Sequence, residues 1–324
     1  MGTTVFKRKI YNEILEWKNN RSDKYALLIR GARRVGKSTI VEEFASKEFK
    51  SYIMLDFART SKDINSLFED LYSLDFFFLQ LQQLTGVRLY EQESVIIFDE
   101  VQLLPKARQA IKYLVEDGRY KYIETGSLLS IRKNTKDILI PSEEHKIDMY
   151  PMDFEEFLWA IGDEVTADTI RILMENKRTA GNTMHRSLMR IFRLYMLVGG
   201  MPQAVETYLA DNNLQAVDEA KREIVDLYEE DFTKIDGTGL AGDVYDAIPA
   251  SLSGNTSRYV LANARAGIKS EQMKELVPDM LSSYTVLIAY HANNPSVGMS
   301  LEKDAGRYKL FTSDVGLFVT LAFR

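Results

Sequence analysis

Residues 31–38 combine two glycines, a lysine and a hydroxyl in the order Gly-Ala-Arg-Arg-Val-Gly-Lys-Ser. This is the phosphate-loop pattern G-x-x-x-x-G-K-[ST], in which the backbone turns so that successive N–H groups point at phosphate oxygens. Lys37 would reach the β- and γ-phosphates, and the Ser38 hydroxyl would bind Mg²⁺. A chance match in a loop is the alternative, but the pattern lies between an expected strand and an expected helix. The residues expected to hold the phosphates are Gly31, Ala32, Arg33, Arg34, Val35, Gly36, Lys37, Ser38 and Thr39.

Two acids follow an apolar run at 94–98, where they would leave the end of a buried strand. Asp99 would hold Mg²⁺ directly or through water, and Glu100 would polarise the attacking water as a general base or an orienting group. The alternative is that both acids only face solvent. The second acid favours hydrolysis over transfer to an acceptor, so a kinase is the weaker possibility.

A third polar group is expected at the end of the stretch Lys-Tyr-Ile-Glu-Thr-Gly-Ser, residues 121–127. Ser127 is the candidate for contact with the γ-phosphate or the attacking water, with Thr125 second. Capping of the next helix is the alternative role for Ser127. An arginine is also expected to stabilise the transition state, and Arg132 and Arg119 are the candidates. The pair Arg33-Arg34 has side chains that could face solvent, nucleotide or a partner.

These groups need a scaffold, and short apolar strands that alternate with helices predict one. Parallel βαβ units in a doubly wound sheet would bring the strand ends, and hence the chemistry, to one edge. Strands are expected at 25–29, 51–57, 94–100 and 121–127, and helices at 5–19, 39–49, 62–84 and 106–118.

The pattern changes after Pro151. Residues 153–234 have a helical period, broken at Gly-Gly-Met-Pro (199–202), and from about 236 the composition shifts to Gly, Ser, Asn and Thr. Two strands are expected at the end of the chain, at 284–292 and 308–314. We therefore expect three domains, at 1–150, 151–235 and 236–324.

The composition excludes several classes of protein. With no cysteine, the chain has neither disulfides nor thiolate metal sites. Its three histidines are far apart, which argues against a dedicated metal-binding histidine. No apolar run approaches the roughly 20 residues of a spanning helix, so neither a membrane partner nor any location but the cytoplasm is expected. A net charge of −6 gives no overall attraction to nucleic acid.

Six motifs together resemble one family, the prokaryotic AAA+-type P-loop ATPases that carry a companion C-terminal domain of unknown function. The most specific are Asp-Glu-Val-Gln at 99–102 and Gly-Gly-Met-Pro at 199–202. The full set is GARRVGKST (31–39), IIFDEVQ (96–102), TGS (125–127), YPMDFEEFL (150–158), VGGMPQAV (198–205) and KLFTSDVGLF (309–318).

This resemblance covers nearly the whole chain and implies an ATP-binding α/β domain, a helical lid and a winged-helix-like α+β segment. It implies ATP and Mg²⁺ as ligands. By the same resemblance Lys37, Ser38, Asp99, Glu100 and Ser127 take the roles described above.

Other positions of the resemblance have open roles. Gln102 matches a glutamine of the family, and either sensing of nucleotide state or packing would explain it. Gly-Gly-Met-Pro is expected to end one helix at Gly199 or Gly200 and to begin another at Pro202.

The chain also departs from the family. Members usually continue into a nuclease-like region where this chain stops at Arg324. We expect either a fragment, with the last domain truncated at its C-terminus, or a chain that lacks that region, so no nuclease activity is carried over. Pro278 is expected to kink its helix or to end it at Val277.

Two functions of different classes follow. The first is an ATP-hydrolysing switch or motor, in which a lid at 151–235 closes on the nucleotide and the last domain carries the motion to a protein partner. The second is an ATP-regulated DNA-binding protein that uses residues 244–314. The second rests on four cations in that region, Arg258, Arg265, Lys269 and Lys274. An oligomer is possible in either case.

Overall fold

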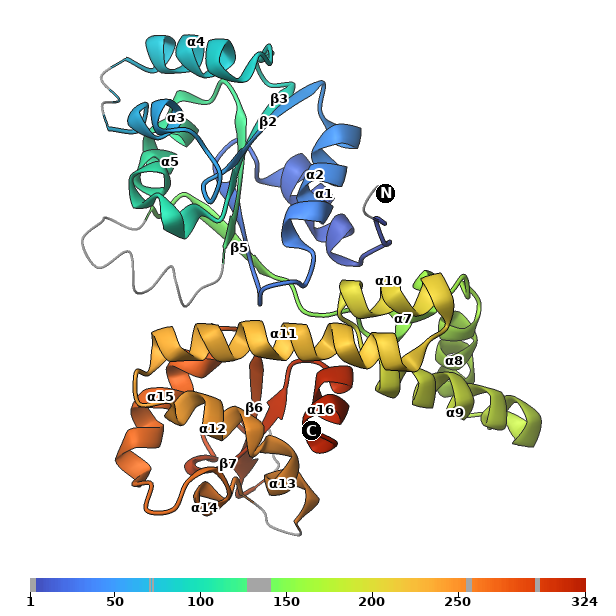
Figure 1. Cartoon of the computed structure of the whole chain (residues 1–324). Helices are drawn as coiled ribbons and strands as arrows, with labels where there is room; N and C mark the ends of the chain where they lie inside the picture. Colours follow the sequence, from blue (N-terminus) through green and yellow to red (C-terminus); the bar gives the residue numbers. More distant parts are fainter. Residues whose placement is uncertain (1–3, 70, 72, 127–140, 255–257, 295–297) are drawn as a thin grey trace. The chain divides into compact units, whose positions relative to one another are not determined.

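The chain forms two compact units, residues 1–149 and 150–324. The computed structural model (Figure 1) describes residues 4–69, 71, 73–126, 141–254, 258–294 and 298–324. In the described part of the chain, no helix has the length and apolar character needed to cross a membrane.

A five-stranded parallel sheet forms the centre of the first unit, in the order β2-β3-β4-β1-β5. Every residue of β3 and β4 is buried. This burial on both faces explains the continuous apolar run of β3, Val95–Phe98. The predicted parallel α/β sheet is confirmed. The strands are β1 (Ala26–Arg30), β2 (Ser51–Asp56), β3 (Ser94–Asp99), β4 (Lys121–Gly126) and β5 (Glu144–Asp148).

Helices cover both faces of this sheet. Figure 1 shows α1 and α2 on one side and α3 and α5 on the other. Phe77 and Phe78 of α4 are buried in the core that faces α5, whereas Phe76 is exposed. The helical elements are α1 (Ile10–Asn20), α2 (Lys37–Glu48), α3 (Lys62–Ser66), α4 (Leu74–Thr85), the short 3₁₀ turn η1 (Val101–Leu103) and α5 (Pro105–Asp117).

The strand β5 was not predicted from the sequence. It pairs only with β1 at the edge of the sheet, and Ile147 is its one aliphatic residue. Edge strands tolerate charge, so apolar patterning does not reveal them. A buried ion pair holds β5 to α5, since Arg108 donates to both carboxylate oxygens of Glu144 at 2.8 and 2.9 Å.

The second unit is helical, with one small antiparallel sheet of β6 (Val286–Ala292) and β7 (Lys303–Thr312). The helical stretch after Pro151 and the two late strands are confirmed, and the winged-helix assignment stays a prediction. The helices are α7 (Phe154–Ala160), α8 (Thr166–Glu175), α9 (Gly181–Val198), α10 (Pro202–Asp211), α11 (Leu214–Ile235), α12 (Leu240–Asp246), α13 (Ile248–Ser253), α14 (Leu261–Ala264), α15 (Ser270–Ser282) and α16 (Val315–Ala322).

Three motifs that are far apart in the sequence meet in this unit. Gly199 ends α9 at φ +85°, and a Cβ there would lie 2.4 Å from Oδ1 of Asp314. The N–H of Gly200 donates to Oδ2 of Asp314 at 2.6 Å, and its carbonyl accepts from the N–H of Met152 at 2.7 Å. The next helix begins at Pro202, as predicted. The glycine pair is therefore needed for close packing as well as for the turn.

Of the two effects predicted for Pro278, the end of the helix at Val277 is wrong, and the kink stays a prediction. Helix α15 continues through Pro278 to Ser282, whose hydroxyl donates to the Pro278 carbonyl at 2.8 Å. Met273 and Met280, on either side of the proline, are both buried. Tertiary packing on both sides thus outweighs the local cost of the proline.

Candidate nucleotide-binding site

The phosphate loop joins β1 to α2 at the carboxyl edge of the sheet. Gly31 is required there, since a Cβ would lie 2.2 Å from the carbonyl oxygen of Met149. Arg34 (φ 67°) and Gly36 (φ 96°) have the left-handed backbone that turns the loop. Ala32 and Val35 are buried, whereas the side chains of Arg33 and Arg34 are exposed. Backbone N–H groups of this loop, followed by a helix N-terminus, suit an anion.

Lys37 opens α2 and lies at the base of the loop. Its ammonium is buried and donates to the carbonyl oxygens of Gly31 and Ala32, at 2.9 Å each. Burial lowers the pKa of Lys37, and the nearby carboxylates of Glu100 and Asp99 oppose this shift. The loop itself therefore holds a cation in place before any phosphate arrives.

Ser38 and Asp99, the two residues predicted to hold Mg²⁺, lie in contact with each other. The Ser38 hydroxyl lies 2.8 and 2.9 Å from the two carboxylate oxygens of Asp99. The hydroxyl of Thr125, at the end of β4, also donates to Asp99. The ends of β3 and β4 and the start of α2 therefore meet at the Asp99 carboxylate, because parallel strands end at the same edge of the sheet. Thr39 follows in the first turn of α2.

Glu100 is the first residue after β3 and has a left-handed backbone at φ 53°. Its N–H donates to the Thr125 hydroxyl at 3.3 Å. Its carboxylate accepts a hydrogen bond from the side-chain amide of Gln102, a residue that is itself buried. The structure thus gives Gln102, whose role the sequence left open, a direct contact with the predicted general base.

Arg8 is a contact of the loop that the sequence analysis missed. This buried side chain donates through Nη1 to the carbonyl of Val35 at 2.9 Å. It precedes α1, far from the motif in sequence, and belongs to no pattern that could have revealed it. Its role is to fix the outer side of the loop.

Not every predicted residue is part of this arrangement. Ser127 and Arg132 lie outside the described residues. Arg119 lies before β4, whose last residue Gly126 pairs with Arg30 next to the loop. Seven residues at about 3.3 Å each place Arg119 roughly 20 Å away along the strand.

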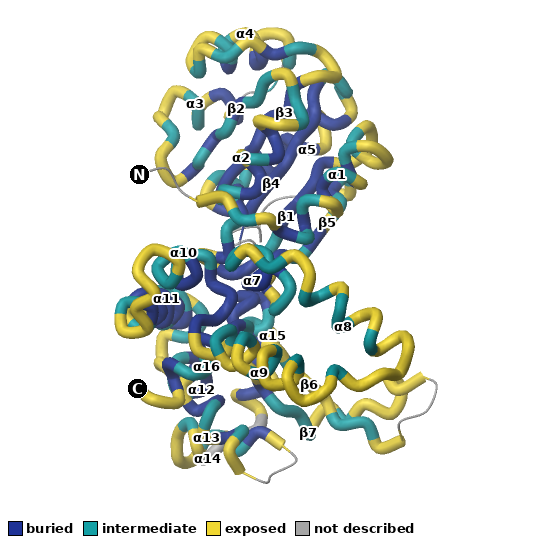
Figure 2. The backbone as a smooth tube through the Cα atoms, turned by 90° about the vertical axis from the view of Figure 1, so that its right-hand side faces the viewer, coloured by how far each residue is buried: buried dark blue, intermediate teal, exposed yellow. Residues whose placement is uncertain are grey.

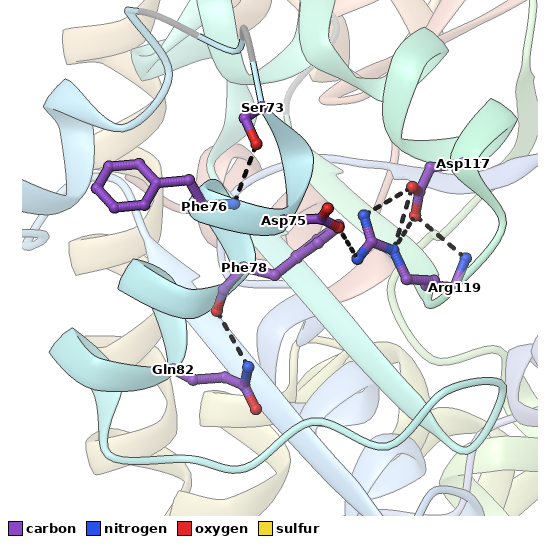
Figure 3. A network of polar contacts seen from close by, with 7 residues as sticks. All are labelled: Ser73, Asp75, Phe76, Phe78, Gln82, Asp117 and Arg119. Atoms are coloured by element: carbon purple, nitrogen blue, oxygen red, sulfur yellow. Dashed lines mark hydrogen bonds and ion pairs between the residues drawn. The ribbon is translucent and has the colours of Figure 1, made fainter.

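Arg119 has a structural role instead. Figure 3 shows its guanidinium between Asp75 of α4 and Asp117 of α5, at 2.6 and 2.8 Å. The same group lies 4.7 Å from the ring centroid of Phe78. Arg119 therefore ties α4 to α5, and it does not reach the phosphate loop of its own domain.

The residues present fit a nucleoside triphosphate with Mg²⁺. Mg²⁺ in such sites is usually bound by one or two carboxylates together with water and phosphate oxygens. Asp99 and the Ser38 hydroxyl would be the ligands that the protein provides. Within the described ranges, no group of three or more His, Asp or Glu suited to a metal exists elsewhere.

Residues 23–158 match a protein family described as an AAA domain. The part of the first unit that holds the phosphate loop is therefore similar to AAA domains. Residues 189–323 match a second family, described as a domain of unknown function. The pairing of an AAA domain with such a companion is the one that the sequence motifs predicted. No curated protein is significantly similar to the chain.

A solved structure shares this architecture beyond the AAA domain. A Walker-type ATPase of Pyrococcus abyssi is 15% identical and matches 98% of this chain and 96% of its own, with a TM-score of 0.56. At that identity the likeness shows the fold alone. The Orc1 protein of Aeropyrum pernix, solved in complex with DNA, is 13% identical over 99% of this chain and 94% of its own. Its TM-score of 0.33 is too low to support an argument.

Proposed function

We propose that the AAA domain binds ATP with Mg²⁺ and hydrolyses the β–γ phosphoanhydride. The observation that carries this proposal is the meeting of Lys37, the Ser38–Asp99 pair and Glu100 at one edge of the sheet. Adenine specificity rests on the family, because the described contacts concern phosphates only.

Each residue of the site would have its own role in binding or hydrolysis. The loop backbone and Lys37 bind and orient the phosphates, and Ser38 with Asp99 holds Mg²⁺. The chemistry that Mg²⁺ would supply when held there is positive charge, which would offset the negative charge that develops on the phosphates. Glu100, oriented by Gln102 and by its own left-handed backbone, would accept a proton from the attacking water.

We further propose that hydrolysis operates a switch or motor, with residues 151–235 as a lid. The helical character of those residues supports a rigid lid. The alternative, DNA binding through residues 244–314, has less support. There Arg265 pairs with Asp243 at 2.6 Å and Lys274 with Glu271 at 3.1 Å, which reduces the positive charge available to phosphates.

Nucleotide binding is tested with Lys37→Ala. Loss of the buried ammonium should abolish measurable ATP binding and phosphate release, and chelation of Mg²⁺ should stop release by the unmodified protein. Lys47→Ala is the matched control, because Lys47 lies on the same helix but is exposed and pairs only with Glu43. Titration with a fluorescent ATP analogue measures the difference. Equal affinity in the two variants would refute the proposed site.

A further inference from the structure

Helix α9 and the turn before it are basic, whereas the chain as a whole is acidic. Residues 176–205 contain no Asp or Glu, although the whole chain has 47 acids and a net charge of −6. The same stretch holds five cations: Lys177, Arg178, Arg186, Arg190 and Arg193. All five are exposed. Figure 2 shows α9 coloured largely as exposed.

Three of these arginines form one stripe. Arg186, Arg190 and Arg193 have the spacing i, i+4, i+7, which places them on one side of a helix. Among the residues that the structure describes, no acid pairs with any of the three. Arg171 and Arg222 of the same unit differ, since each pairs with an aspartate.

The opposite side of α9 anchors the helix to its own unit. Tyr195 lies roughly 160° around the helix from Arg193 at about 100° per residue. Its hydroxyl donates to the Met152 carbonyl at 2.9 Å, and its ring lies 5.3 Å from that of Phe157 in α7. Tyr195 is thus used for packing, whereas the three arginines are left to solvent.

We propose that this arginine stripe, Arg186, Arg190 and Arg193, binds the phosphate backbone of duplex DNA. The stripe spans roughly 10 Å at about 1.5 Å per residue. Each DNA strand carries one phosphate per about 3.4 Å of axis, so the stripe can meet several phosphates at once. Guanidinium groups bind phosphate in a bidentate manner.

Two features favour duplex DNA over other polyanions. An anionic membrane would need the apolar side of an amphipathic helix to be free. Tyr195 of that side packs on Phe157 of α7, whereas Phe192 is exposed, so only part of this side is available. Duplex RNA has a deep, narrow major groove, whereas that of B-DNA admits an α-helix. Contacts to phosphates alone would make the binding independent of base sequence.

The test compares two variants of equal charge change in the full chain. Arg186→Gln/Arg190→Gln/Arg193→Gln removes the stripe, and the control Arg265→Gln/Lys269→Gln/Lys274→Gln removes cations from the other candidate region. Fluorescence anisotropy measures binding of a labelled DNA duplex of mixed sequence, without nucleotide, between 50 and 200 mM salt. Circular dichroism and the melting temperature confirm that each variant folds.

The stripe variant should bind at least about tenfold more weakly at the lowest salt. Its plot of log K against log salt should be flatter by about 2.7, because each lost phosphate contact removes roughly 0.9. The control should bind as the unmodified protein does. No binding by the unmodified protein, equal loss in the control, or tighter binding to duplex RNA or phosphatidylserine vesicles than to DNA would overturn the proposal. ATP turnover does not enter this result, so failure of the proposed hydrolysis would be seen separately.

Discussion

At the scale of single residues, each group of the candidate site is held by a neighbour before a ligand arrives. Lys37 is fixed by loop carbonyls, and Ser38 and Asp99 hold each other. Glu100 is restrained through its carboxylate by Gln102. Catalytic groups that are already oriented reduce the entropy lost on reaching the transition state.

Gln102 is therefore predicted to be a positioning residue. Gln102→Met keeps a similar volume but has no N–H to donate, so the Glu100 carboxylate would sample other orientations. We expect kcat to fall about tenfold, equivalent to roughly 1.4 kcal/mol in the barrier, with KM for ATP nearly unchanged. Steady-state phosphate release measures both constants. A variant with lower thermal stability but an unchanged kcat would show that Gln102 only packs.

At the scale of elements, the parallel strands place the residues of the candidate site at one edge of the sheet. They also bury one acidic residue, Glu124, inside the sheet. Glu124 of β4 is fully buried, and neither of its carboxylate oxygens has a hydrogen-bond partner among the described residues. Burial raises the pKa of Glu124 well above its usual value, and the charge of Glu144 adds to this. Arg108 and Lys146 oppose the shift, although Arg108 is already paired with Glu144.

This acid should make stability depend on pH. Between the pKa of the unfolded chain and the raised pKa of the fold, the folded state binds one proton more, so the free energy of unfolding falls as pH rises. Glu124→Gln removes this pH-dependent contribution to the free energy of unfolding. The variant should melt close to the unmodified protein near pH 5 and above it at pH 8, by about 2–4 °C for each kcal/mol gained. Melting temperatures measured across this range test the prediction, and a pH-independent difference would contradict it.

The elements also show where sequence reasoning succeeds. The inner strands were predictable because apolar runs such as Val95–Phe98 occur where a strand is covered on both faces. The loop and the acids Asp99 and Glu100 were predictable because phosphate chemistry fixes residue types at fixed spacing. By contrast, β5 has polar residues of an edge strand, and the Arg8 contact joins segments that no local pattern relates.

At the scale of the whole molecule, a stretch similar to AAA domains is followed by one similar to a domain family of unknown function. In our account ATP turnover takes place in the first, and the second carries its own basic surface on α9. The net charge of −6 does not reveal this basic surface, because acids elsewhere in the chain outweigh the positive charge of residues 176–205. The local pattern of charge, rather than the net charge of the chain, therefore indicates the candidate surface for binding a polyanion.

The central claim is that Glu100 turns over ATP held by the loop, and Glu100→Gln tests it most directly. The variant is incubated with ATP and Mg²⁺, separated from free nucleotide, and its bound nucleotide is identified by chromatography. The unmodified protein should release phosphate and hold ADP. The variant should retain intact ATP, with turnover lower by about 10²–10⁴, because a general base is lost while Lys37 and the loop are unchanged. Turnover of ATP by the variant at the unmodified rate would contradict the account.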